Sequence, residues 1–138
     1  MLLHHFTKAW REIEAAGMIE ARWPETLDGP FTTRFVHLSR SDSVDSLPEA
    51  IRREVRERIT VEISDTEAVA WLPWLRQNFP QAEWSLGDKP RTLAGAVVRD
   101  GEASQWYVTA RAIPAVQWLT TVDLNSGSTL WTPASHGR

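Results

Sequence analysis

The C-terminal third of this chain alternates apolar and polar side chains, which is the pattern of strands that bury one face. Two turn signals interrupt the alternation: Asp100-Gly101 is typical of a two-residue hairpin turn, and Asn125-Ser126-Gly127 of a slightly longer one. Strands joined by turns this short lie antiparallel to one another. We therefore predict a C-terminal β-meander with strands over residues 93–99, 105–113, 115–123 and 129–131.

Helical periodicity is found in the first 80 residues. Three apolar stripes, each next to a capping or stop signal, predict three helices. The stripes are Phe6, Trp10 and Ile13 before Gly17; Leu47, Ile51 and Val55 after a Ser46–Glu49 capping box; and Val69, Leu72, Leu75 and Phe79 after a Ser64–Glu67 capping box. Within the third stripe, Pro73 is expected to kink or split the helix, because it has no N–H to donate to the carbonyl of Val69.

Two further alternating runs, residues 31–38 and 59–63, predict strands between the helices. A length of 138 residues suits one domain, and we find no internal repeat or low-complexity segment. We therefore predict an α+β fold in a single domain, residues 1–138. Its core would be a predominantly antiparallel sheet covered by about three helices.

Charge and residue content exclude several kinds of site. The net charge of −3, from 15 basic and 18 acidic residues, makes nucleic acid an unlikely partner, because nucleic-acid-binding domains are normally basic. The chain has no cysteine, and its four histidines (His4, His5, His37 and His136) lack the spacing of metal ligands, so no metal is predicted. Neither a glycine-rich phosphate loop nor a nucleophile elbow occurs. We predict no cofactor and no catalytic residues, which favours a non-enzyme.

Two features bear on where the chain works. No run of 18 apolar residues occurs, and the first residues lack the basic and apolar regions of a signal peptide. We therefore predict no membrane segment and a cytoplasmic protein. Only Lys8 and Lys89 are lysines, against 13 arginines, a bias typical of GC-rich bacterial genomes.

Tryptophan is unusually frequent, with eight in 138 residues. Its large side chain carries an N–H that needs a partner, and it serves cores, interfaces and ligand sites equally well. Trp106, Trp118 and Trp131 fall on one face of the predicted meander, and we expect them to stack there beneath the helices. The remaining tryptophans need a different explanation.

The predicted helix that holds Trp71 and Trp74 is apolar nearly all round, because Leu72 and Leu75 stand beside them. This helix is either wedged between the sheet and the N-terminal helix, or turned in part toward a partner protein. Exposed tryptophans are enriched at interface hot spots. The second alternative predicts an exposed interface patch formed by Trp23, Trp71, Trp74 and Trp84.

Arg34 and Arg111 form a second candidate site, because each lies mid-strand among apolar neighbours. If either faces a cavity, its planar guanidinium can bind both oxygens of a carboxylate ligand. The alternative is that both side chains point to solvent.

Two segments resemble the chorismate lyase family and the related ligand-sensing domains of some bacterial repressors. Residues 29–35 match a small residue followed by Thr, a basic residue (Arg34) and an aromatic residue. Residues 93–114 match a hairpin in which an Asp-Gly turn leads into a strand that contains Arg111. The resemblance implies an antiparallel sheet with a pocket and a carboxylate ligand. Small residues at 94–96 replace the family's substrate-binding arginine, so an intact lyase is not implied.

Two functional hypotheses follow from these patterns. The first is a non-enzymatic binding module of the inhibitor or immunity type, which would contact another protein through its Trp-rich surface. The alternative is a binding domain for a cyclic or aromatic carboxylate, with a fold like that of chorismate lyase and no intact lyase activity. Exposed tryptophans would favour the first, and an arginine turned inward would favour the second.

Overall fold

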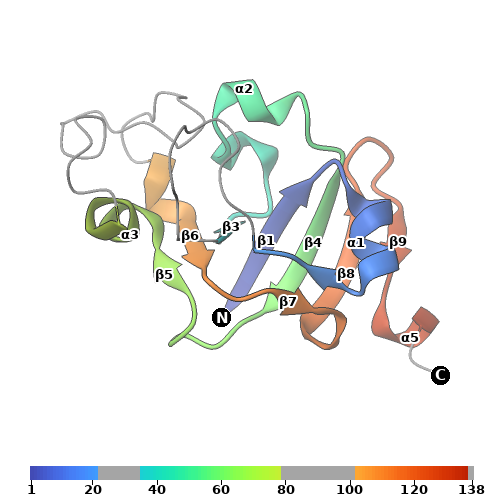
Figure 1. Cartoon of the computed structure of the whole chain (residues 1–138). Helices are drawn as coiled ribbons and strands as arrows, with labels where there is room; N and C mark the ends of the chain where they lie inside the picture. The colour runs from blue at the N-terminus through green and yellow to red at the C-terminus, as the bar shows by residue number, and fades with distance from the viewer. Residues whose placement is uncertain (22–34, 79–101, 137–138) are drawn as a thin grey trace.

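A computed structural model of the chain describes residues 1–21, 35–78 and 102–136. A seven-stranded antiparallel sheet with the order β5-β6-β3-β1-β4-β8-β9 forms its centre (Figure 1). A separate ribbon pairs β2 with β7. The elements are β1 (Leu2–Thr7), α1 (Trp10–Ala16), β2 (Met18–Ile19), β3 (Val36–Ser39), η1 (Val44–Ser46), α2 (Glu49–Arg52), β4 (Glu57–Glu62), β5 (Val69–Ala70), α3 (Trp71–Asn78), η2 (Glu102–Gln105), β6 (Trp106–Thr109), β7 (Ile113–Pro114), η3 (Ala115–Gln117), β8 (Trp118–Asp123), β9 (Thr129–Trp131) and α5 (Pro133–His136).

Two groups of buried side chains lie on opposite faces of the sheet. The alternation along β6 separates them, because Trp106 and Val108 join one group while Tyr107 contacts the other. We call the larger group the main core: Leu3, Trp10, Ile19, Val36, Leu38, Ile59, Val61, Ile63, Ile113, Trp118 and Trp131. We call the smaller group the aromatic cluster: Phe35, Trp71, Trp74, Leu75, Trp106 and Val108.

The α+β class and the antiparallel sheet are confirmed, but the C-terminal meander is wrong. β6 and β8 are separated in the sheet by β3, β1 and β4, and the predicted strand 105–113 breaks so that β7 pairs with β2 instead. Alternation shows which face of a strand is buried, but every strand shares that pattern, so it cannot select the neighbour. The hairpin of β8 and β9 is confirmed, with Gly127 at φ +74°. The predicted strand 93–99 and its Asp100-Gly101 turn lie outside the described residues.

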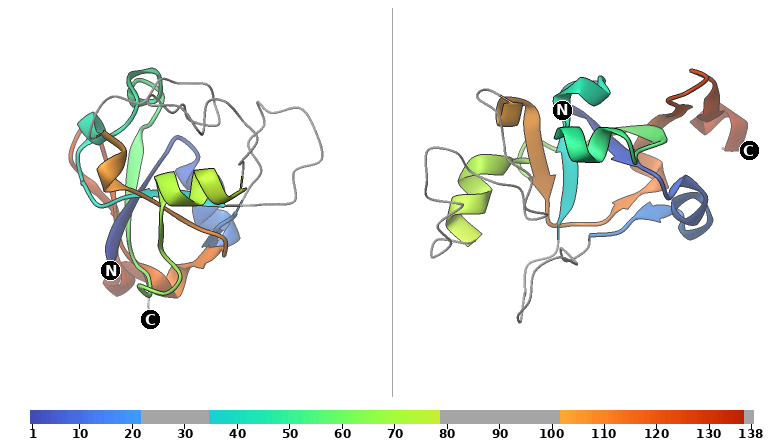
Figure 2. Two further views of the ribbon diagram at one scale, coloured as in Figure 1. Left: turned by 90° about the vertical axis from the view of Figure 1, so that its left-hand side faces the viewer. Right: turned by 90° about the horizontal axis from the view of Figure 1, so that it is seen from above.

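The prediction of about three covering helices is also wrong. In the described part of the chain, α1 and α3 are the helices longer than a single turn, and α2 and α5 each have four residues. Phe6 belongs to β1 instead of the first helix, which begins at Trp10 and ends, as predicted, at Gly17 in a left-handed conformation with φ +70°. α1 and α3 lie at opposite ends of the molecule, so α3 is not wedged against the N-terminal helix (Figures 1 and 2).

Neither predicted capping box opens a helix. Ser46 ends η1, and the N-cap of α2 is Pro48. The hydroxyl of Ser64 accepts a hydrogen bond from the Thr66 amide at 3.3 Å within a turn. Because α3 begins only at Trp71, Pro73 occupies its first turn, where an N–H would have no carbonyl partner inside the helix. The expected kink at Pro73 therefore has no cause.

Tryptophans of the sheet are buried as predicted, but they do not form one stack. Trp118 contacts Trp131 edge-on, with 5.4 Å between ring centroids, and it also contacts Trp10 edge-on at 5.7 Å. Trp106 lies in the aromatic cluster, on the opposite face of the sheet. Among the helices that the structure describes, none has the length and apolar character needed to cross a membrane.

Candidate functional site

The aromatic cluster is built where α3 lies against β6 and the residue before β3. The spacing of Trp71, Trp74 and Leu75 places all three side chains on one helix face. Trp71 meets Trp106 edge-on at a centroid distance of 5.1 Å, and Trp74 meets Phe35 at 4.6 Å. Both contacts are in the range where aromatic pairs stabilise each other beyond their buried area.

The indole N–H groups of this cluster differ in their hydrogen bonding. Trp106 Nε1 donates to the carbonyl of Ser46 at 2.6 Å, and Trp118 Nε1 in the main core donates to the carbonyl of Ile113 at 3.0 Å. Trp71 Nε1 is fully buried and finds no acceptor among the described residues. A buried donor left unsatisfied costs about 1–3 kcal/mol, so this position is a weak point in the cluster.

A pair of histidines borders the aromatic cluster at the junction of β1 and β3. These two strands share a single paired row, His4 with Ser39. Next to this row, the side chain of His5 extends from β1 toward β3, and its Nδ1 donates to the carbonyl of His37 at 2.9 Å. The His37 ring lies edge-on to Phe35 at 4.8 Å. The side chain of His5 thus takes the place of a backbone hydrogen bond between the strands.

Both imidazoles favour the neutral form. Removal from water and, to a smaller extent, the nearby His5 lower the pKa of His37 to about 4. Burial also lowers the pKa of His5, and the hydrogen bond to the His37 carbonyl opposes that shift. By its accessible surface His37 is nevertheless an exposed residue, so the neighbouring protein lowers its pKa without sealing it from solvent. Aromatic rings and neutral imidazoles favour contact with apolar or uncharged groups. Among the described residues, no three potential metal ligands lie close together.

A different surface presents apolar side chains to solvent. In the ribbon of β2 and β7, Ile19 and Ile113 pair and point into the main core, while Met18 and Pro114 pair and point outward. Two residues further on, in η3, Val116 is 88% exposed. We call Met18, Pro114 and Val116 the ribbon stripe. The outward face of a half-buried ribbon is normally polar, so an outward pair of apolar residues followed by the exposed Val116 in η3 is unusual.

Two of the four predicted interface tryptophans, Trp71 and Trp74, are buried. Trp71 is 0% and Trp74 is 7% exposed, because α3 turns both indoles onto the sheet. Trp23 and Trp84 lie outside the described residues. Any role of the four in an interface stays a prediction, and Trp71 and Trp74 offer no free indole for it.

The predicted ligand-binding arginines are also only partly placed. Arg111 is 79% exposed and forms an ion pair with Glu67 at 3.4 Å, so it points to solvent and not into the interior. Arg34 lies outside the described residues. Binding of a carboxylate by either stays a prediction, and titration with hydroxybenzoates while following tryptophan fluorescence would test it.

Sequence reasoning missed the ribbon stripe, although a signal for it exists. Once Ile113 is assigned to the core, the period of two places Pro114 on the opposite face. Comparison with protein-family models, with curated proteins and with solved structures found no match for this chain.

Proposed function

We propose that this chain is a non-enzymatic protein-binding module and that its contact surface is the ribbon stripe. The observation that carries the proposal is the 88% exposure of Val116 beside the outward pair of Met18 and Pro114. Burial of a valine side chain stabilises a fold by about 1.5–3 kcal/mol. Val116 makes no such contribution here, because its side chain is exposed. Single exposed apolar residues are ordinary, but neighbouring ones mark interaction sites.

The partner that fits is a protein with an apolar contact surface and a net positive charge. With a net charge of −3, the chain would attract a basic partner. An inhibitor or immunity-type protein works by this kind of contact.

The test places a photo-crosslinking amino acid at position 116, and at Leu130 as a control. Leu130 is also exposed, but it lies on β9, which does not pair with the ribbon. A protein captured only at position 116 would then be purified, and its affinity measured by calorimetry for the wild type, Val116→Asp and Leu130→Asp. We expect Val116→Asp to weaken binding by about 30-fold or more, the size of a hot-spot loss, and to leave the melting temperature unchanged.

Three outcomes would contradict the proposal. The first is equal affinity of the wild type and Val116→Asp for the captured protein. The second is capture at position 130 alone. The third is self-association of the wild type that Val116→Asp abolishes, because the stripe would then bind a second copy of this chain. Sedimentation of the free protein distinguishes the third outcome from the others.

A further inference from the structure

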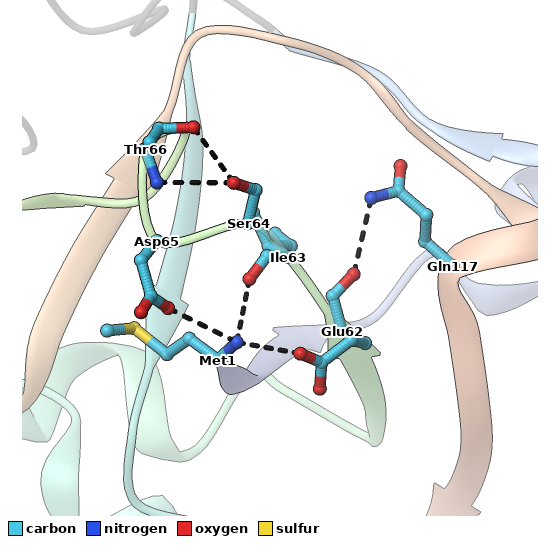
Figure 3. Close-up of polar contacts among 7 residues, drawn as sticks. All are labelled: Met1, Glu62, Ile63, Ser64, Asp65, Thr66 and Gln117. Carbon is cyan, nitrogen blue, oxygen red and sulfur yellow. Dashed lines mark hydrogen bonds and ion pairs between the residues drawn. The ribbon is translucent and has the colours of Figure 1, made fainter.

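Residues 113–119 form a corner that carries the chain from the ribbon of β2 and β7 through η3 into β8. Hydrogen bonds join this corner to its neighbours on both sides. The Ala115 amide donates to the carbonyl of Gly17, directly before β2, at 2.9 Å. Gln117 Nε2 donates to the carbonyl of Glu62, at the end of β4, at 3.2 Å (Figure 3). The corner is therefore held by the ribbon and by the main sheet.

The side chain of Trp118 closes the same corner from the inside. The Trp118 amide donates to the carbonyl of Ala115 and ends η3, and its indole Nε1 donates to the carbonyl of Ile113 at 3.0 Å. The indole is 2% exposed and contacts Trp10 and Trp131 edge-on. Because one buried side chain ties the two ends of the turn together, the corner has little freedom to change its shape.

The outer side of the corner carries exposed apolar side chains, Pro114, Val116 and Leu119. Val116 is 88% exposed, whereas a side chain on a flat or hollowed surface is partly covered by its neighbours. Val116 therefore projects from the protein. Leu119 is 43% exposed and has no partner on β4, because a bulge shifts the register of β4 and β8 between Thr60 and Val61.

We propose that this corner is a rigid binding loop that inserts Val116 into an apolar pocket of the partner protein, with Trp118 as its positioning residue. The inference rests on the function proposed above and adds the shape of the partner's surface. A flat surface would touch only the tip of a projecting side chain, whereas a pocket surrounds it and removes it from water, as at interface hot spots. A loop that is already ordered loses little conformational entropy on binding.

The first experiment tests the pocket by changing the size of the inserted side chain. Calorimetry gives the affinity of each variant for the protein that is captured at position 116. We expect Val116→Ala to weaken binding by about tenfold, because it leaves part of the pocket empty. We expect Val116→Trp to weaken binding by at least as much, because a pocket that fits valine cannot hold an indole. On a flat surface the larger apolar side chain would bind equally well or more tightly.

The second experiment tests the positioning role with two matched variants, Trp118→Phe and Trp106→Phe. Each removes one hydrogen bond from a buried indole to a backbone carbonyl, but Trp106 lies on the opposite face of the sheet. We expect Trp118→Phe to weaken binding by about 3- to 10-fold and Trp106→Phe to leave the affinity unchanged. In the free protein, the ¹⁵N order parameters of the Val116 and Gln117 amides should fall in Trp118→Phe alone.

The outcomes separate this inference from the function on which it rests. Equal affinity of the wild type and Val116→Asp would refute the proposed function itself. If Val116→Asp weakens binding but Val116→Trp does not, the contact surface stands and the pocket is refuted. If Trp118→Phe matches the wild type in affinity and in order parameters, Trp118 does not position the loop.

Discussion

The unsatisfied N–H of Trp71 leads to a prediction about two tryptophans in direct contact. Replacing Trp71 or Trp106 by phenylalanine removes the same atoms from the same cluster, and both side chains are buried. The loss of packing is therefore comparable in the two variants. The difference between them comes from the hydrogen bonds, because Trp106 donates to the Ser46 carbonyl and Trp71 has no acceptor in the described part of the chain.

The magnitude follows from those hydrogen bonds. Trp106→Phe gives up a bond with a net value of about 1 kcal/mol, whereas Trp71→Phe removes a buried donor that costs about 1–3 kcal/mol. Trp106→Phe should therefore be the more destabilising by about 2–4 kcal/mol. In a domain of this length the two melting temperatures should differ by roughly 7–14 °C.

The measurement is urea unfolding followed by far-UV circular dichroism, which does not depend on the number of indoles. Equal m values in all variants would show that the unfolded states are comparable. Trp118→Phe is the control, because Trp118 donates to the Ile113 carbonyl and should behave like Trp106. If Trp71→Phe destabilises the protein as much as Trp106→Phe does, the Trp71 N–H has an acceptor and the reasoning is refuted.

Two further predictions concern the backbone. Gly17→Ala should lower the free energy of unfolding in urea by about 1–2 kcal/mol, because φ at Gly17 is +70°. The loss would be backbone strain alone, since the space around an added Cβ is open. Gly17→Asn should cost less. Pro73→Ala should change the free energy of unfolding by less than about 1 kcal/mol, because Pro73 blocks no hydrogen bond of α3. A gain in stability near 3 kcal/mol would contradict this, because it would mean that Pro73 lies in a helix interior.

Local signals in the sequence predicted the elements whose structure is determined locally. The left-handed end of α1 at Gly17 and the hairpin turn at Gly127 need only a glycine between two periodic runs, and both are confirmed. The strand over residues 59–63 was also predictable, because its alternation is regular and corresponds to β4. These features require no information about distant parts of the chain.

The errors concern choices that are made between distant segments. β1 contains two histidines at its centre, so its alternation was hidden and Phe6 fitted a helical stripe instead. The pairing of β6 with β3 and β5 depends on burying Trp106 beneath α3, which no local pattern reveals. For the candidate site, the sequence indicated more apolar residues than a core needs, and we expected tryptophans to be the exposed ones. In the structure Val116 is exposed, and Trp71 and Trp74 are buried.

The position of β1 in the middle of the sheet has a consequence for how the protein is made. Thr7 pairs with Glu57 and Leu2 with Glu62, so during synthesis β1 meets β4 only 50 to 60 residues later. At ordinary rates of synthesis this interval lasts about 3–12 s. During that time the edge of β1 that pairs with β4 is open, and edges of this kind attract other chains. The yield of native protein should therefore depend on translation speed and on chaperones that shield nascent segments. Equilibrium stability alone would not predict this dependence.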